Sequence, residues 1–94
     1  MGESIEIRCK RLRYQCSRRG TKELDYLLGR FTEAHVARLT ADQLDRFEAL
    51  LANPDPDIYR WIRGGEPVPE EFDSDVMQLI KNFTYQVLSP EIAK

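Results

Sequence analysis

Apolar residues recur at helical spacing along almost the whole of this 94-residue chain. Ile5, Cys9, Leu12 and Cys16 lie at i, i+4, i+7 and i+11, so they share one face of a helix. No segment alternates apolar and polar residues for long enough to indicate a strand. The pattern predicts five helices, over residues 4–18, 21–38, 41–52, 56–63 and 69–88, followed by a frayed tail at 89–94.

Residues that favour helix ends support these boundaries. Arg18 and Arg19 suit the last turn of the first helix, and Gly20 suits its stop. Thr40-Ala41-Asp42-Gln43 has the spacing of a capping box. Asp55 is a favourable N-cap, Pro56 a favourable first helical residue, and Gly64-Gly65 a favourable end. Short connections between five amphipathic helices predict an all-α fold, a compact five-helix bundle in a single domain.

The same spacing predicts which side chains are buried. The later helices direct these residues inward: Leu24, Leu27, Leu28, Phe31 and Ala34; Leu44, Phe47, Leu50 and Leu51; Phe72, Val76, Leu79, Ile80, Phe83 and Val87. Gly29 interrupts the second helix, where a small residue would let another element approach closely.

Charge is distributed unevenly along the chain. Seven Lys and Arg residues against three Glu residues leave residues 1–23 with a net charge of +4, whereas the remainder carries −6. A basic end on an acidic body is a charge asymmetry that points to the junction, at residues 18–25, as the place to seek function. No apolar run is long enough to span a bilayer, so we expect no membrane insertion. The first four residues do not resemble a secretion signal, which favours a cytoplasmic protein, or a mitochondrial matrix protein whose presequence has been removed.

The residues needed for catalysis or metal binding are scarce. His35 is the only histidine, and we interpret it as an ordinary half-exposed residue. Cys9 and Cys16, seven apart on one helix, are too distant to form a disulfide, and we interpret both as buried apolar residues. The acidic cluster Glu70, Glu71, Asp73 and Asp75 suits a solvated helix start. The sequence therefore argues against an enzyme and predicts neither a catalytic residue nor a metal site.

Two features indicate recognition of a partner. Residues 18–25, Arg-Arg-Gly-Thr-Lys-Glu-Leu-Asp, contain an Arg-Gly-x-x-Glu pattern, although helix-end preferences alone would also explain it. Tyr59 and Trp61 are two positions apart on a short helix, so they cannot both point into the core. Either they anchor a partner, or Trp61 fills the core and Tyr59 is merely exposed; the sequence leaves both interpretations open.

These residues resemble the SdhE (YgfY) family of small five-helix FAD assembly factors. The Arg-Gly-x-x-Glu signature is Arg19, Gly20 and Glu23 here, and residues 54–62 are similar to the family's Asp-Pro-Asp-aromatic-x-Trp segment. The likeness continues through Gly65-Glu66-Pro67 and covers about residues 8–88. Thr21 stands where the family commonly has methionine or leucine, outside the signature.

The resemblance implies a non-catalytic factor that binds the flavoprotein subunit of succinate dehydrogenase and promotes covalent attachment of FAD to it. The flavoprotein of fumarate reductase is implied as a related client. No cofactor would be held permanently, and FAD would be contacted only transiently with the client. Arg19, Gly20, Glu23 and Trp61 match family motifs, and we expect Arg18, Asp25, Arg11 and Tyr59 to extend the partner-binding surface.

A competing interpretation uses the basic first helix to bind phosphates, as an antitoxin-like or nucleic-acid-binding protein would. The negative net charge and the lack of a base-reading helix pattern make nucleic acid the weaker prediction. A helical adaptor with some other client is the third interpretation.

Overall fold

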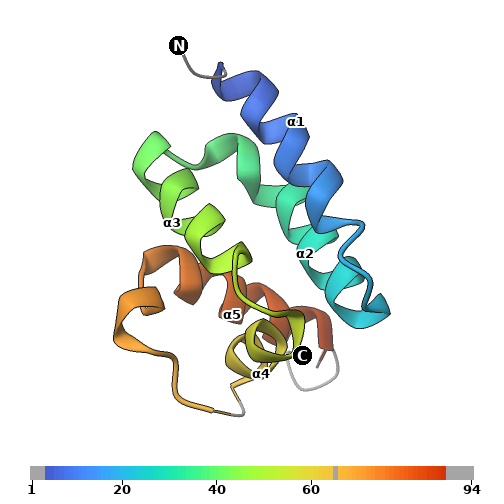
Figure 1. Cartoon of the computed structure of the whole chain (residues 1–94), viewed down its shortest axis with the longest axis vertical. Helices are drawn as coiled ribbons and strands as arrows, with labels where there is room; N and C mark the ends of the chain where they lie inside the picture. Colours follow the sequence, from blue (N-terminus) through green and yellow to red (C-terminus); the bar gives the residue numbers. More distant parts are fainter. Residues whose placement is uncertain (1–3, 65, 89–94) are drawn as a thin grey trace. The chain divides into compact units, whose positions relative to one another are not determined.

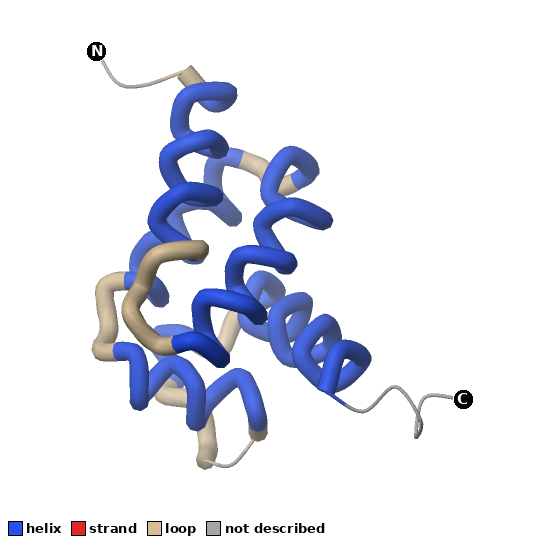
Figure 2. The backbone as a smooth tube through the Cα atoms, turned by 90° about the vertical axis from the view of Figure 1, so that its right-hand side faces the viewer, coloured by secondary structure: helices blue, strands red, loops and turns tan. Residues whose placement is uncertain are grey.

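The structure is a computed structural model that describes residues 4–64 and 66–88. Five α-helices and two short 3-10 helices make up its elements: α1 (Ile5–Cys16), α2 (Lys22–His35), η1 (Val36–Arg38), α3 (Ala41–Leu51), α4 (Asp55–Arg63), η2 (Glu70–Phe72) and α5 (Asp75–Leu88). These described ranges contain no strand (Figure 2). The predicted all-α class with five helices is confirmed.

The chain divides into two compact units, Met1–Asp45 and Arg46–Lys94. The first holds α1, α2, η1 and the start of α3, and the second holds the rest of α3, α4, η2 and α5. That the units form a single domain remains a prediction. The predicted tail at 89–94 and Gly65 lie outside the described residues.

In the first unit, α1 and α2 pack side by side (Figure 1). Their buried faces consist of Cys9, Leu12 and Cys16 on α1, and Leu24, Leu27, Leu28, Phe31 and Thr32 on α2. Burying a Leu or Phe side chain contributes about 1.5–3 kcal/mol, so these faces dominate the stability of the pair. A Cβ on Gly29 would lie 3.5 Å from the Ser17 Cβ, which identifies the element that approaches this glycine as the end of α1.

Two predicted core positions of the first unit are wrong, because each lies at the edge of its stripe. Ile5 is in the first turn of α1 and Ala34 is near the end of α2, and both are exposed. The buried stripe on α2 continues instead to Val36, where a 3-10 turn replaces the last predicted α-helical turn.

The end of the first helix differs from the prediction. Ser4 caps α1, its hydroxyl accepting from the Ile7 N–H at 3.2 Å, and α1 ends at Cys16 rather than at residue 18. Arg18 and Arg19 therefore lie beyond the last turn, and Arg13 is the basic residue within it. The capping box is confirmed: Thr40 N–H donates to Gln43 Oε1 at 2.9 Å and Gln43 N–H donates to Thr40 Oγ1 at 3.1 Å.

In the second unit, α4 and α5 pack against each other. The N-cap of α4 is Pro54, so Asp55 is the first helical residue rather than the cap. Ile58, Trp61 and Ile62 form its buried face, and Gly64 ends it with a left-handed φ of 84°. A residue with a Cβ would resist this conformation, which is why glycine is favoured there.

The fifth helix begins six residues later than predicted. Residues 70–72 form η2, and α5 starts at Asp75 because Ser74 caps it, its hydroxyl accepting from the Met77 N–H at 3.3 Å. Phe72 is consequently not part of α5. The buried face of α5 is Val76, Met77, Ile80 and Thr84, whereas Leu79 is exposed and Phe83 and Val87 are half-buried. The prediction of burial was correct at Val76 and Ile80. The remaining buried positions are Met77 and Thr84, one position away from those predicted.

Candidate functional site

The 18–25 segment joins α1 to α2 and is held by one carboxylate. Asp25, in the first turn of α2, accepts hydrogen bonds at Oδ1 from the Arg19 N–H at 2.5 Å and from the Gly20 N–H at 3.2 Å. Two bonds from backbone N–H groups to one charged acceptor are stronger than neutral bonds. The path of the segment is therefore specified by a side chain, not left to a flexible loop.

Gly20 is required here by its backbone conformation. Its φ is +108°, a value that residues with a side chain rarely adopt, while a Cβ built on it would meet nothing within 4 Å. The surface around Gly20 is thus open, and a partner backbone can approach it closely. Gly20 does not cap α1, because Ser17 occupies that position.

Charged side chains of the 18–25 segment differ in exposure. Glu23 and Arg18 are exposed, and Arg19 is half-buried. The Arg18 guanidinium lies over the Tyr14 ring at 4.6 Å from its centroid, a cation–π contact that orients this side chain. The segment therefore presents charges of both signs next to a bare glycine.

Cys16 lies beneath this surface as a protonated thiol. Burial raises its pKa from 9.0 to about 12, although the nearby Arg19 guanidinium acts in the opposite direction. A thiol in this state is a poor nucleophile and a poor metal ligand. Cys9 is buried as well, its Sγ donating to the Val36 carbonyl at 3.6 Å, so both cysteines are buried as predicted. Within residues 4–64 and 66–88, no three His, Cys, Asp or Glu residues converge as a metal site would require.

Tyr14 belongs to this surface and was not among the residues predicted to bind a partner. It is 62% exposed, and it borders a groove of about 250 Å³ that is also lined by Arg13, Ser17, Gly29, Thr32 and Glu33. The available signal was the i, i+4 spacing of Tyr14 and Arg18 across the end of a helix, which suits a cation–π pair.

The remaining predicted residues lie elsewhere. Arg11 is half-buried on α1, and its Nη1 donates to Gln15 Oε1 at 3.4 Å. Trp61, in the second unit, is only 8% exposed and its ring stacks on Phe72 with centroids 5.6 Å apart. Tyr59 is half-exposed and contacts the Arg63 guanidinium. Of the two interpretations left open by the sequence, the one in which Trp61 fills the core matches this burial.

Basic residues of the first unit are partly engaged with other groups of the chain. The Arg8 Nη2 forms an ion pair with Asp45 at 2.6 Å, and Arg11 and Arg18 have the contacts described above. On α1 itself, Arg8 and Arg11 are therefore engaged within the chain, which favours a phosphate-binding strip along this helix less than the sequence alone did.

Comparison with known proteins identifies the family. Residues 10–84 match the family described as "Flavinator of succinate dehydrogenase". This chain belongs to that family. The matched range includes the whole 18–25 segment and α4, and thus all the residues predicted to bind a partner.

Individual family members are similar over most of this chain. It is 44% identical over 78 residues to succinate dehydrogenase assembly factor 2, mitochondrial, of Dictyostelium discoideum, covering 83% of this chain and 55% of that protein. It is 35% identical over 85 residues to the protein of the same name from Danio rerio, covering 88% and 54%. It is 39% identical over 69 residues to FAD assembly factor SdhE of Acetobacter pasteurianus, covering 73% and 63%. The chain thus spans between half and two thirds of these relatives' lengths.

The predicted SdhE family is therefore confirmed. Relatives in this family carry names of assembly factors, not of enzymes. Among the described residues, no helix has both the length and the apolar character needed to cross a membrane.

Proposed function

We propose that this chain binds the flavoprotein subunit of succinate dehydrogenase through the 18–25 segment and thereby promotes covalent attachment of FAD to that subunit. One observation carries the proposal: Asp25 holds the backbone of Arg19 and Gly20 in one conformation that leaves Gly20 and Glu23 exposed. A preformed loop loses less conformational entropy when it binds. The family and the names of the relatives support this client and this reaction.

Each part of the segment has a chemical role in this interaction. Arg18 and Arg19 pair with carboxylates of the client, and Glu23 accepts hydrogen bonds from client donors. Gly20 lets the client backbone approach without meeting a side chain. By holding the client in one arrangement, the factor keeps the flavin ring next to the side chain to which it becomes attached, a positioning effect.

The bond-forming chemistry belongs to the client, and this chain is not an enzyme. FAD is contacted only as part of the client complex. We extend the proposal to the flavoprotein of fumarate reductase as a related client. The compartment is the bacterial cytoplasm or, for a chain freed from its presequence, the mitochondrial matrix.

Covalent flavin on the client is the direct measurement. In cells lacking the factor, in-gel fluorescence of the flavoprotein should be restored by the wild-type chain and not by Glu23→Gln or Arg18→Gln. The free energy of unfolding of both variants should lie within about 0.5 kcal/mol of the wild-type value, because substitutions at exposed positions rarely cost more. Arg30→Gln is the matched control, since Arg30 is an exposed arginine of α2 in a cation–π contact with Tyr26. Normal flavin attachment by Glu23→Gln, or a loss matched by a fall in stability, would refute the proposal.

The molecules that co-purify with the chain in a pulldown distinguish the proposed function from the nucleic-acid alternative. The proposed function predicts a flavoprotein in the eluate that persists at moderate salt. Recovery of nucleic acid, lost steeply as salt increases, would support the alternative instead.

A further inference from the structure

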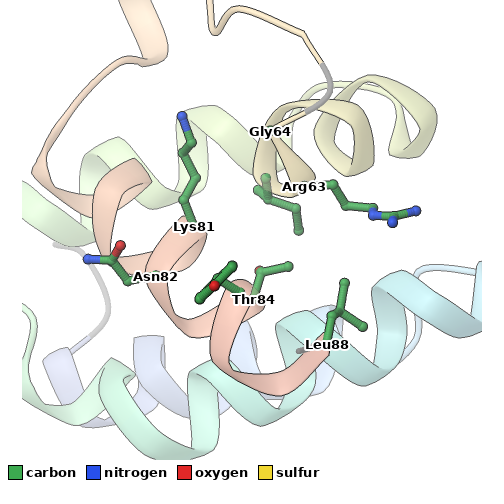
Figure 3. Close-up of a pocket in the computed structure, with 8 residues that line it drawn as sticks. Arg63, Gly64, Lys81, Asn82, Thr84 and Leu88 are labelled. Atoms are coloured by element: carbon green, nitrogen blue, oxygen red, sulfur yellow. The ribbon is translucent and has the colours of Figure 1, made fainter. Parts of the chain in front are cut away.

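A pocket in the second unit is lined in part by a threonine whose buried hydroxyl has no hydrogen-bond partner among the described residues. The C-terminal end of α4 and the last two turns of α5 enclose about 340 Å³, lined by Ile62, Arg63, Gly64, Lys81, Asn82, Thr84, Tyr85 and Leu88 (Figure 3). Thr84 is 1% exposed, and its Oγ1 forms no hydrogen bond within the described residues. Buried hydroxyls in proteins are normally satisfied, so an unsatisfied one at the wall of a pocket points to a ligand.

A cation lies on the same face of α5. Lys81, Thr84, Tyr85 and Leu88 are spaced i, i+3, i+4 and i+7, so they form one stripe toward the pocket. Lys81 is half-buried, and no described residue forms an ion pair with its ammonium group. The Arg63 guanidinium, in contrast, is turned to Tyr59, lying 5.3 Å from that ring's centroid, with Nη1 3.4 Å from the hydroxyl. Figure 3 shows Lys81 and Arg63 extending in different directions.

These groups select the charge of the ligand. Lys81 only donates hydrogen bonds, and the Thr84 hydroxyl can donate one after rotation about χ1, for which threonine in a helix has two accessible rotamers. These two donors, one of which is a cation, match an anion. The C-terminal ends of α4 and α5 both contribute to this pocket and carry partial negative charge, which disfavours any anion and disfavours a multiply charged one such as phosphate the most. A single carboxylate fits both requirements.

The apolar part of the wall selects the rest of the ligand. Ile62 is buried, and the side chains of Tyr85 and Leu88 are 54% and 46% exposed, so they offer apolar surface that a bound molecule would cover. A volume of 340 Å³ is at the small end of ligand sites.

We propose that this pocket binds a carboxylate with a compact apolar body, with Lys81 pairing with the carboxylate, Thr84 donating to it, and Ile62, Tyr85 and Leu88 contacting the body. The carboxylate belongs either to a free small molecule or to an acidic side chain of a partner. No residue of the 18–25 segment lines this pocket, and the proposal does not depend on the proposed function.

Amide-resolved NMR titration of the full chain tests the site directly. Phenylacetate should give saturable shifts at residues 62–64 and 81–88, and its neutral counterpart phenylacetamide should bind at least about tenfold more weakly, because a charge-assisted bond is lost. Lys81→Met should weaken phenylacetate binding by a similar factor and leave phenylacetamide unaffected. Arg63→Met is the matched control and should weaken phenylacetate less than Lys81→Met does.

Thr84→Val separates a binding role from a structural one. It removes the hydroxyl at nearly constant volume, so the chain should melt at the same temperature or higher, while phenylacetate binds more weakly. Unchanged phenylacetate affinity in Thr84→Val, equal affinity for phenylacetamide, or the absence of saturable shifts would each overturn the proposal.

The source of the carboxylate is then resolved by competition. If it is a side chain of the flavoprotein, phenylacetate should displace that protein from the wild-type chain, and Lys81→Met should bind the flavoprotein less well. If it is a free molecule, phenylacetate and the flavoprotein should bind together. Failure of the flavoprotein to bind at all would count against the proposed function and leave the titration of the pocket standing.

Discussion

Two segments of the sequence indicated recognition, residues 18–25 in the first unit and residues 55–61 in the second, and the structure uses them differently. In the first, charged side chains and a bare glycine remain at the surface while Asp25 holds the backbone beneath them. In the second, the conspicuous aromatic residue turns inward, where Trp61 stacks on Phe72. The two segments therefore differ in accessibility: the charged side chains of Arg18 and Glu23 are exposed and can meet a partner, whereas the large aromatic side chain of Trp61 is part of the core.

The largest expected effect follows from the burial of Trp61. Trp61→Ala should lower the free energy of unfolding by about 3–5 kcal/mol, because it leaves a cavity next to Phe72. Urea unfolding monitored by circular dichroism measures this loss. Tyr59→Ala is the matched control and should cost about 1 kcal/mol or less, since Tyr59 is half-exposed. A Trp61→Ala variant of normal stability that no longer bound the client would show that Trp61 binds the partner and does not stabilise the core.

The thiol beneath the 18–25 segment should make stability depend on alkaline pH. The unfolded thiol ionises near pH 9, whereas the folded Cys16 keeps its proton to about pH 12, because burial raises its pKa. Between these values the unfolded state binds fewer protons, so the free energy of unfolding falls as pH rises, by up to about 1.4 kcal/mol per pH unit. Below pH 9 the Cys16 thiol is protonated in both the folded and the unfolded state, so its full contribution to the free energy of unfolding is retained.

Comparing urea midpoints of wild type and Cys16→Ala between pH 8 and pH 11 isolates this slope. Lysine and tyrosine titrate in both proteins, so only the difference in slope reports on Cys16. Both cysteines of the chain are in the first unit, and the effect should be confined to it. Parallel pH profiles would show that Cys16 is accessible to solvent.

Removing the carboxylate that holds the loop should have an intermediate effect. Asp25→Ala leaves the Arg19 and Gly20 N–H groups without their acceptor and should cost about 1–3 kcal/mol. Glu23→Ala, two residues away, should change stability by less than about 0.5 kcal/mol, because Glu23 is exposed. Hydrogen exchange at the Arg19 amide would report the loss locally. Equal thermal stability of Asp25→Ala and Glu23→Ala would mean that the segment is not held by Asp25.

The smallest expected effects distinguish two glycines. Gly20 and Gly64 both have positive φ, and a Cβ on either would meet nothing within 4 Å. Gly20→Ala and Gly64→Ala should therefore each cost about 1–2 kcal/mol through backbone strain alone. Only Gly20→Ala should also reduce covalent flavin on the client, because only Gly20 lies in the proposed contact surface. Equal losses of flavin attachment in both variants would point to stability as the common cause.

Much of the fold follows from short-range pattern. The apolar spacing located five helices, and Thr40 and Gln43 marked the start of α3 correctly because a capping box acts within four residues. The start of α5 was misplaced for the same reason: Pro69, Glu70 and Glu71 are as suitable for a helix start as Ser74, and only the backbone path through η2 selects the later cap. Leu79 was assigned to the core because it lies three residues after Val76, a spacing typical of one helix face, but its side chain is exposed.

Side-chain roles were less predictable than elements. The residues of the Arg-Gly-x-x-Glu pattern were recognised, but the part of Asp25 as acceptor for two amides was not, since it depends on how the backbone turns after α1. The unsatisfied hydroxyl of Thr84 gave no signal, because an isolated threonine in a helix is ordinary until its neighbours are known.

The order of apolar and polar residues was thus sufficient for the helices and most of their buried faces, and the motifs at residues 18–25 and 54–62 were sufficient for the resemblance to the family. The three-dimensional packing was needed to show that Trp61 is buried while Tyr59 is half-exposed, that Asp25 holds the loop, and that α4 and α5 leave a pocket at Thr84. The physical reason is range: helix propensity and capping act over about four residues, whereas burial and hydrogen-bond satisfaction depend on which distant side chains fill the same space.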